Sequence, residues 1–423
     1  MSHAQRNIRR IPRSFWALVA GDMLSTLGVS IYTLVILYIV QQYSSNILLN
    51  GFVGALSHIP PVIAGFGLGM LVDRMSRKRA MVMANFFVAM LAWIPLWANL
   101  HTVWGYTLVV LTDFFIQTAM YWEQLGHNAY VKFLVPPEHL ARSEGILQSL
   151  ASLGFPVGMI WVFLIVGHGP IRWLLGISAG VAGIVGLITW IFLPADPLPL
   201  QDDSGGTPWE LFEEGLRWIK EVPSLLWYVY QTVFANGAIN ILMALIIYDM
   251  GHQGLFHHVP IIAVLGAGLG MGLGGLTVST LSSRIRLLWL IIFGRLVFAL
   301  GLIGIAQKFS IFAVAASLTL IFWGQNVSGT ALVTWRTQST PLAYQGRISS
   351  TVAQISSLTS WTLIIGVSAL DQVTHHVALG FYVAASLVLV SLAVIGVGMR
   401  TGHFRLPRYL GDETSRRPIN ESW

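Results

Sequence analysis

Twelve stretches of this chain are long and apolar enough to cross a lipid bilayer, and they constrain the fold more than any other feature. A spanning helix needs about 20 mostly apolar residues. The candidates are 15–41, 49–72, 80–100, 103–125, 144–167, 172–193, 224–248, 259–282, 287–307, 310–333, 349–370 and 378–399. The sequence therefore predicts an all-α integral membrane protein with twelve transmembrane helices.

A longer polar stretch divides the twelve segments into two sets of six. Its start is rich in Asp, Pro and Gly, and 209–220 carries apolar residues at amphipathic-helix spacing. That helix is expected along the inner membrane surface, the alternative being a soluble linker helix. The predicted organisation is an N-terminal six-helix half, a cytoplasmic linker with the amphipathic helix, a C-terminal six-helix half and a cytoplasmic tail, at 1–193, 194–223, 224–400 and 401–423.

The net charge of +6 is distributed so that it fixes an orientation in the membrane. With the N-terminus inside, 21 of the 24 Lys and Arg residues fall in inner loops and termini, and only Arg172 and Lys308 fall outside, with Arg295 inside a helix. The positive-inside rule then places both termini in the cytoplasm, for a multi-pass protein of the plasma membrane. Because the basic residues set topology, no nucleic-acid partner is needed.

The loop between the second and third segments carries a charged motif. Its residues, Gly69 to Arg79, follow the pattern G-x-L-x-D-R-x-G-R-[RK] except at Ser76, where the pattern has glycine. A degraded copy follows the eighth segment, with Ser279 in the place of Asp73. The loops after the fourth and tenth segments are also alike, so the sequence predicts that the two halves are structural repeats.

In this order and spacing, the motifs resemble those of the major facilitator superfamily. Further matches are 134–140 leading into 148–154, 214–218 before the seventh segment and 346–350 before the eleventh. Within the superfamily the chain is most similar to the branch of macrolide-efflux proteins and the enterobactin exporter. The resemblance implies the major facilitator fold, export driven by the proton gradient, and a cavity lined by helices 1, 4, 7 and 10 near the midplane.

The loop motif is also a candidate gate. Asp73 can pair with Arg77 or cap a neighbouring helix, which would clasp the inner ends of the two halves in one transport state. The alternative is a topological anchor with solvated charges. The gating residues under this hypothesis are Gly69, Asp73, Arg74, Arg77 and Lys78.

Charges inside the predicted spans need a reason, because each costs about 2.5–3.5 kcal/mol at a helix centre. Asp113, near the midplane of helix 4, is the first choice for proton coupling or cation recognition; a permanently hydrogen-bonded carboxylate is the alternative. Asp22 in helix 1 fits coupling and interhelix bonding equally well. Glu123 is expected as a solvated boundary charge and Arg295 as a structural one.

Polar stripes on helices 4, 7 and 10 supply candidate substrate contacts. In lipid such groups either bond between helices or line a watery cavity, and both readings stay open. The assigned residues are Gln117, Tyr121, Asn236, Asn240 and Asn326. The glycines of 266–275 are expected to let helix 8 approach its neighbours closely.

No catalytic constellation is visible, so we expect a protein that is not an enzyme and needs no cofactor or metal. The chain has no cysteine, and its paired external histidines are expected to be solvated. The leading hypothesis is a monomeric secondary transporter in the bilayer that exports drugs or amphipathic molecules in a proton-coupled, alternating-access cycle. The alternatives are a lipid or siderophore transporter of the same fold, or a non-transporting membrane receptor or scaffold.

Overall fold

The computed structural model describes most of the chain, and all regular structure in that part is helical. The described residues are 12–43, 47–56, 58–63, 75–98, 102–135, 143, 146–147, 150–151, 153–166, 172–196, 208–252, 263–281, 285–307, 310–339 and 345–401. Helix is the expected form, because a chain in lipid must satisfy its own backbone hydrogen bonds.

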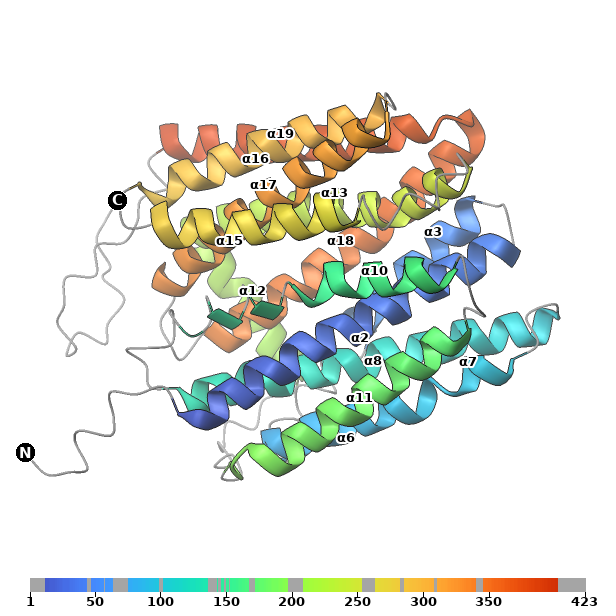
Figure 1. The fold of residues 1–423 in the computed structure, drawn as a ribbon. Coiled ribbons are helices and arrows are strands. Elements are labelled where there is room, and N and C mark those ends of the chain that lie inside the picture. Colours follow the sequence, from blue (N-terminus) through green and yellow to red (C-terminus); the bar gives the residue numbers. More distant parts are fainter. Residues whose placement is uncertain are drawn as a thin grey trace, which may run out of the picture.

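The helices form an antiparallel bundle (Figure 1). The first group comprises α2 (Arg13–Tyr43), α3 (Ile47–Leu56), α4 (Ile59–Ile63), α6 (Arg77–Leu91), α7 (Ile94–Trp97), α8 (Val103–Leu134), α10 (Gly154–Val166) and α11 (Arg172–Phe192). The second group comprises α13 (Pro223–His252), η2 (Ala263–Gly268), α15 (Leu269–Leu281), α16 (Leu287–Ala306), α17 (Ile311–Ser339), α18 (Gln345–Thr374) and α19 (Val377–Arg400). Between the groups lies α12 (Pro208–Glu221).

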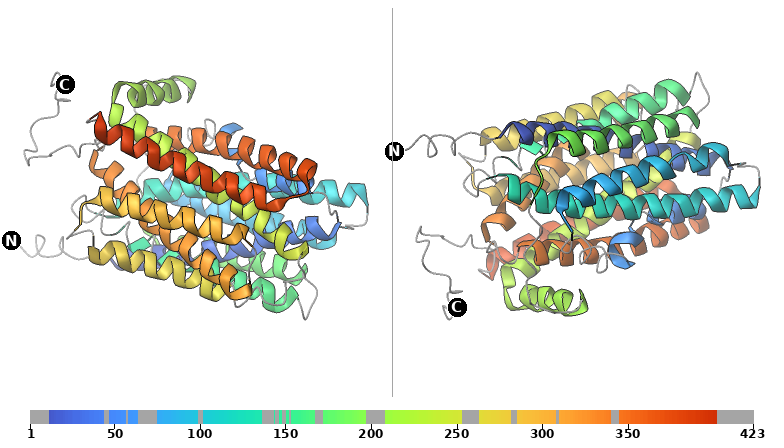
Figure 2. Two further views of the ribbon diagram at one scale, coloured as in Figure 1. Left: turned by 90° about the horizontal axis from the view of Figure 1, so that it is seen from above. Right: turned by 90° about the horizontal axis from the view of Figure 1, so that it is seen from below.

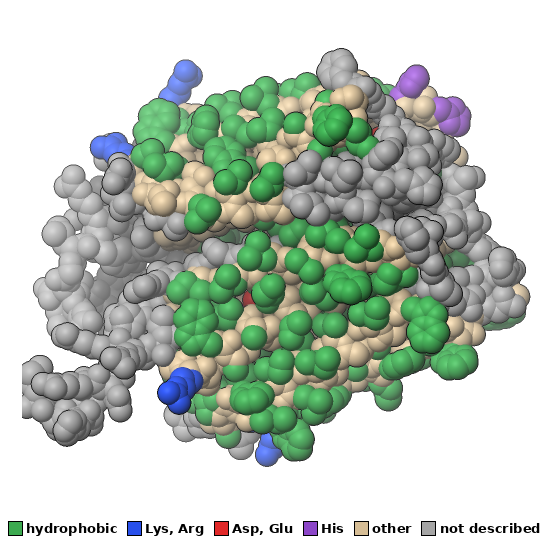
Figure 3. Space-filling view, viewed as in Figure 1, with side chains coloured by type: hydrophobic (Ala, Val, Ile, Leu, Met, Phe, Trp, Pro, Cys, Tyr) green, Lys and Arg blue, Asp and Glu red, His purple; other side chains and the backbone are tan. Residues whose placement is uncertain are grey.

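Eight helices in the described part are long and apolar enough to cross a membrane. We call the end where α2 begins and α19 ends the proximal end, and the opposite end the distal end. On the face shown in Figure 3, Lys and Arg gather toward the proximal end, His lies at the distal end, and the flank between is largely hydrophobic. This is the surface of a protein that passes through a bilayer several times.

Tryptophan side chains mark both edges of the apolar flank. Exposed tryptophans gather near the two ends of the spans rather than at their middles, at Trp93, Trp97, Trp104 and Trp173 distally and at Trp16, Trp190 and Trp289 proximally. Indole rings favour the membrane–water interface because they combine an apolar body with a polar N–H. The two bands therefore agree with the bilayer position that the hydropathy gives.

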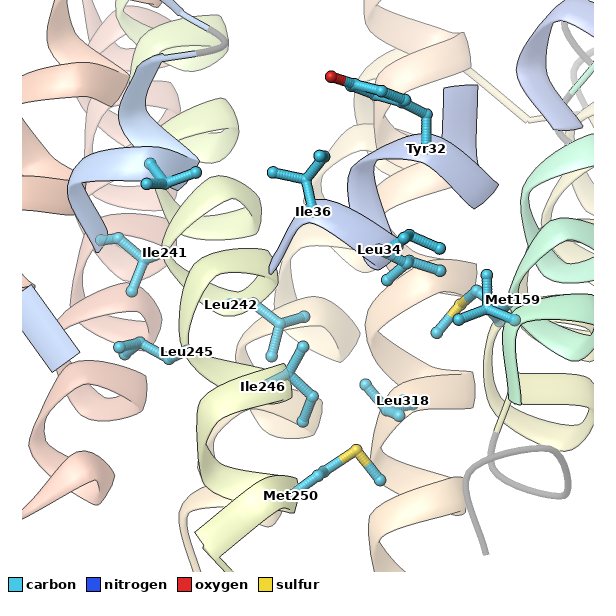
Figure 4. Packing of buried hydrophobic residues seen from close by; sticks show 14 of the residues in the cluster. Tyr32, Leu34, Ile36, Met159, Ile241, Leu242, Leu245, Ile246, Met250 and Leu318 are labelled. Carbon is cyan, nitrogen blue, oxygen red and sulfur yellow. The ribbon is translucent and has the colours of Figure 1, made fainter. Parts of the chain in front are cut away.

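The distal end holds a hydrophobic core that is shared by both groups of helices. Figure 4 shows Ile36 of α2 near Leu242 of α13, Leu34 of α2 on the side of Met159 of α10, and Ile246 of α13 near Leu318 of α17. The rings of Phe155 on α10 and Phe322 on α17 also meet, 6.0 Å apart. We call this shared core the distal seal.

Among the described residues of the proximal end, the buried apolar side chains separate into two clusters. One contains Phe15, Met81, Tyr130 and other residues of the first group alone. The other contains residues of the second group with Ile219 of α12. The two groups are therefore joined by apolar packing distally, whereas each has its own core proximally.

Glycines permit close helix approach within the second group, as the 266–275 run predicts. A Cβ at Gly266 would lie 2.7 Å from the Leu318 Cβ, and one at Gly270 would lie 2.6 Å from the Thr319 carbonyl oxygen, both on α17. Gly294 of α16 and Gly324 of α17 likewise face each other's backbone. The expectation of close packing by helix 8 is confirmed.

The linker helix α12 lies outside the bundle at the proximal end (Figure 2). Ile219 is buried against α13, while Glu210, Glu213, Arg217 and Lys220 are exposed. Its apolar side is thus turned toward the second group and its charges toward the surroundings.

Replacing Gly294 tests the α16–α17 packing. We expect Gly294→Ala to lower the free energy of unfolding by about 1–3 kcal/mol, because its Cβ would lie 2.7 Å from the Gly324 carbonyl oxygen. Thermal unfolding of the purified protein measures the loss. Gly272→Ala is the matched control, since no atom lies within 4 Å of a Cβ there. Equal stability of the two variants would contradict the packing account.

Candidate functional site

A cavity of about 430 Å³ lies among α2, α8 and α18. Its lining is rich in groups that form hydrogen bonds or carry charge, although most of the surrounding bundle is apolar. The polar lining residues are Asp22, Ser25, Thr26, His58, Gln117, Tyr121, Glu123, Gln124, His127, Asn128 and Ser357. Polar side chains concentrated at this depth are the expected signature of a solute pathway.

The cavity lies directly on the proximal side of the distal seal. On α2 its lining runs from Asp22 to Val29, and the contribution of α2 to the seal begins at Ile31. On α8 its lining runs from Gln117 to Val131, which is the proximal half of that helix. In the described part of the chain, the apolar seal therefore bounds the cavity on its distal side.

Three titratable side chains meet in this cavity. Asp22 comes from α2, while Glu123 and His127 are one turn apart on α8 and so share a face. Each of the three interacts electrostatically with the other two. Asn85 of α6 lies beside the Glu123 carboxyl group, and its amide donates to the Met81 carbonyl at 2.9 Å.

Glu123 lines the cavity inside the bundle, whereas its sequence position predicts a charge at the end of the span. The reason is that α8 continues to Leu134, beyond the expected end of the span. The carboxyl group consequently sits inside the bundle and lines the cavity. The predicted apolar span ends at residue 125, before the helix does, because the face of α8 that lines the cavity is polar.

Asp113 lies behind the cavity wall rather than on it. Its side chain is only 3% exposed and is not part of the cavity lining. The Gln117 amide donates a hydrogen bond of 3.3 Å to its Oδ1, and the Tyr32 phenol of α2 lies beside it. Asp22 lines the cavity directly, so the structure gives the two predicted coupling residues different settings.

The predicted substrate-contact residues also divide into those that line the cavity and those that do not. Gln117 and Tyr121 line the cavity, and the buried Tyr121 hydroxyl has no hydrogen-bond partner among the described residues. Asn236, Asn240 and Asn326 do not line it. The Asn240 amide donates to Ser360 Oγ of α18 at 3.0 Å, and Asn326 Oδ1 accepts from Thr330 at 3.3 Å.

Arg295 is a buried residue of α16 that bonds to the neighbouring helix. Its guanidinium donates to Gln325 Oε1 of α17 at 2.7 Å, and the side chain is 2% exposed. It lies outside the cavity lining. These contacts fit the structural role expected for it.

At the proximal end, α6 begins on a carboxylate from a distant part of the chain. The backbone N–H groups of Arg77 and Lys78 donate to the two carboxylate oxygens of Asp196, at 2.7 and 3.1 Å. The Lys78 ammonium donates to the Leu193 carbonyl at 2.6 Å, and the Tyr130 hydroxyl to the Pro194 carbonyl at 2.8 Å. This proximal joint ties α6, α8 and the end of α11 together.

Sequence reasoning did not find the contact of Asp196 with the start of α6, because Asp196 is one of several polar residues at the start of the linker. Of the proposed gating residues, Gly69, Asp73 and Arg74 lie outside the described residues, while Arg77 and Lys78 belong to the proximal joint.

Ser76 is the N-cap of α6, with its hydroxyl accepting from the Arg79 N–H at 3.2 Å. Its extended backbone (φ −61°, ψ 132°) does not require the glycine of the pattern.

No group of three or more His, Cys, Asp or Glu side chains that could hold a metal ion occurs in the described part of the chain. What the cavity offers instead is two carboxylates, two imidazoles and uncharged hydrogen-bonding groups around a space of small-molecule size. Such a site can bind and release a polar or charged solute and exchange protons with water.

Comparison with known proteins identifies the family. The family model of the Major Facilitator Superfamily matches residues 18–367. The chain belongs to this superfamily. It is therefore a multi-pass membrane protein with the helical fold of that superfamily, and the family resemblance drawn from its motifs is confirmed.

Among curated relatives, Macrolide efflux protein A of Streptococcus pyogenes is 29% identical over 147 residues, which cover 34% of this chain and 35% of that protein. The chain thus spans about a third of the length of the relatives it matches at this level. Macrolide efflux protein A of Enterococcus faecalis is 28% identical over 324 residues, covering 72% of this chain and 95% of that protein.

Solved structures of superfamily members share the fold at low sequence identity. The xylose transporter XylE from E. coli, in a partially occluded inward-open conformation, matches with a TM-score of 0.71 and 13% identity. The match covers 96% of this chain and all of that one. This match supports the arrangement of the helices. It carries no argument about the side chains that line the cavity.

Replacing Asp196 tests the proximal joint. We expect Asp196→Ala to lower the free energy of unfolding by about 2 kcal/mol, because two N–H groups at the start of α6 lose a charged acceptor. Asp196→Asn should lose about half as much, since an amide oxygen still accepts. Thermal unfolding of both variants, with the exposed Glu213→Ala as control, measures the effect. Wild-type stability of Asp196→Ala would refute the role.

Proposed function

We propose that this superfamily member is a secondary active transporter that exports drugs or other amphipathic small molecules in exchange for protons. The observation that carries the proposal is the polar cavity with two carboxylates, placed next to an apolar seal between two groups of helices. The relatives named as macrolide efflux proteins favour export of a bulky, partly apolar solute.

Alternating access gives the distal seal its function. The two groups, as two six-helix halves, would rock about the cavity so that the seal opens when the proximal ends close. The positive-inside rule makes the proximal end cytoplasmic, so the seal faces the outside. In this conformation the protein would take up solute from the cytoplasm or the inner leaflet.

Proton coupling is assigned to Asp22 and Asp113, with Glu123 and His127 as partners of Asp22. Asp22 meets the solute directly, since it lines the cavity. Asp113 would respond to the solute through Gln117, because the Gln117 amide donates to Asp113 and also lines the cavity wall. Tyr32 beside Asp113 would carry the response to α2. Carboxylates in such settings are suited to reversible protonation.

Solute contact is proposed for Gln117 and Tyr121 in the present conformation. Asn236, Asn240 and Asn326, on α13 and α17, would join them when the groups of helices rock. The gating proposal for Gly69, Asp73, Arg74, Arg77 and Lys78 is that the loop motif clasps the proximal ends in the opposite state. The proximal joint would keep α6 rigid while it does so.

Transport in proteoliposomes with an imposed pH gradient tests the function. We expect wild-type protein to move macrolides or dyes only when the gradient is present, and Asp22→Asn and Asp113→Asn to reduce the gradient-driven rate at least tenfold. Glu213→Gln, at an exposed position of α12 outside the cavity, is the control. Gradient-independent transport would exclude proton coupling. Transport of lysolipids or siderophores in place of drugs would favour the alternative solute classes.

Replacing Gly51 tests the distal seal. A Cβ at Gly51 of α3 would clash with the Ser368 hydroxyl of α18, so Gly51→Val should open the distal end. Because the chain has no cysteine, spin labels can be attached to cysteines placed at Phe52 and Leu370. We expect the distance between these distal labels to increase by several ångströms in Gly51→Val. An unchanged distance distribution would show that the seal tolerates the side chain.

A further inference from the structure

We propose that one face of α18 lines the passage by which the solute leaves the cavity through the distal end. In the present conformation α18 packs against α3 and α4 of the first group, and the face would be uncovered when the two groups separate there. The proposal rests on the proposed function and deepens it, because it names the helix of the second group that the solute contacts during export. This exit face consists of Gln354, Ser357, Trp361, Ile364 and Ser368.

Helical spacing places the five side chains of the exit face on one side of α18. Successive members are three or four residues apart, the separation at which residues of an α-helix lie above one another. Exposed residues of the same helix, such as Leu358 and Leu370, lie on a different side. The exit face is therefore not the side of α18 that is turned to lipid.

The distal half of the exit face is covered by α3. A Cβ at Gly51 of α3 would meet the Ser368 hydroxyl and would lie 3.7 Å from the Ile364 carbonyl oxygen. Ala55, one turn further along α3, forms a small buried cluster with Ile364, and Trp361 packs against it. The two helices thus touch closely, and opening of the distal end has to separate them.

The proximal half of the exit face reaches the cavity. Ser357 lines the cavity from α18, and His58, beside α4, lines it from the first group. Gln354, one turn before Ser357, is 8% exposed. The exit face therefore runs without interruption from the cavity, along α3, to the distal end.

Polar atoms of the exit face are buried without a hydrogen-bond partner among the described residues. They are Gln354 Oε1, Trp361 Nε1 and Ser368 Oγ. An unpaired buried polar group destabilises the conformation in which it occurs, and native structures contain few of them. Separation of α18 from α3 would give these atoms water or the solute as partners. We infer that the polar groups are kept for that second conformation.

The chemistry of the exit face defines the class of solute that suits it. A glutamine amide and serine hydroxyls both donate and accept hydrogen bonds, and an indole combines an N–H donor with a large apolar ring. None of these side chains titrates near neutral pH. The exit face therefore suits an amphipathic solute that carries uncharged hydrogen-bonding groups on an apolar frame.

Thiol labelling tests whether the exit face is uncovered during transport. Because the chain has no cysteine, Ser368→Cys and Ser356→Cys each have a single reactive site. Ser356 is the matched control, since its hydroxyl is also buried without a partner but lies on the opposite side of α18. We expect a water-soluble maleimide to label Ser368→Cys about tenfold faster when erythromycin and a pH gradient are present, because the distal-open population rises. The rate for Ser356→Cys should not change.

A spin-label distance separates failure of this proposal from failure of the proposed function. It is measured between cysteines placed at Phe52 and Leu370, under the same conditions. If this distance increases but Ser368→Cys reacts no faster than Ser356→Cys, the exit face is not part of the passage and the proposed function stands. If the distance does not change, macrolide export by alternating access and the exit passage both fail.

A second pair of variants tests the hydrogen-bonding role. Ser368→Ala and Ser356→Ala each remove one unpartnered hydroxyl, so both should unfold at a temperature no lower than the wild type. Ser368→Ala should slow erythromycin transport about fivefold, because one hydrogen bond to the passing solute is lost. Ser356→Ala should transport at the wild-type rate. Equal transport rates of the two variants would contradict a contact between Ser368 and the solute.

Discussion

The distal seal is the contact on which the rest of this structure depends. Burial of apolar side chains joins the two groups of helices at that end, where α2 and α13 meet through residues such as Leu34, Ile36 and Leu242. At the proximal end each group has its own apolar core instead. Polar side chains can therefore lie between the seal and the proximal end without being buried in apolar packing.

Charge inside the bundle follows this division. Asp22, Glu123 and His127 stand in the cavity, where water can reach them, while Arg295 is packed between α16 and α17 and bonds to Gln325. The cost of a charge in a membrane interior explains why each of them has either a cavity or a polar partner. The same reasoning makes the cavity groups functional candidates and Arg295 a packing residue.

At the proximal end, both the local sequence and a tertiary contact stabilise the start of α6. Ser76 caps α6 from within the loop motif, which accounts for serine where the motif has glycine. Asp196, more than a hundred residues later, supplies a second acceptor at the same helix start. The Ser76 cap is a preference of the local sequence. The Asp196 contact exists only because α11 ends beside α6.

The sequence by itself determined the helical membrane fold and the polar face of α8, because hydrophobic length, charge asymmetry and helical spacing are properties of neighbouring residues. Its motifs also carried the resemblance to the superfamily. It identified Gln117, Tyr121 and Asp22 on those grounds, and each lines the cavity. Only the tertiary structure decided that Asp113 lies behind the wall and that Asp22 of α2 lines the same cavity as Glu123 and His127 of α8. Those facts depend on where α8 ends and which helix faces it, and both are set by packing between segments far apart in the chain.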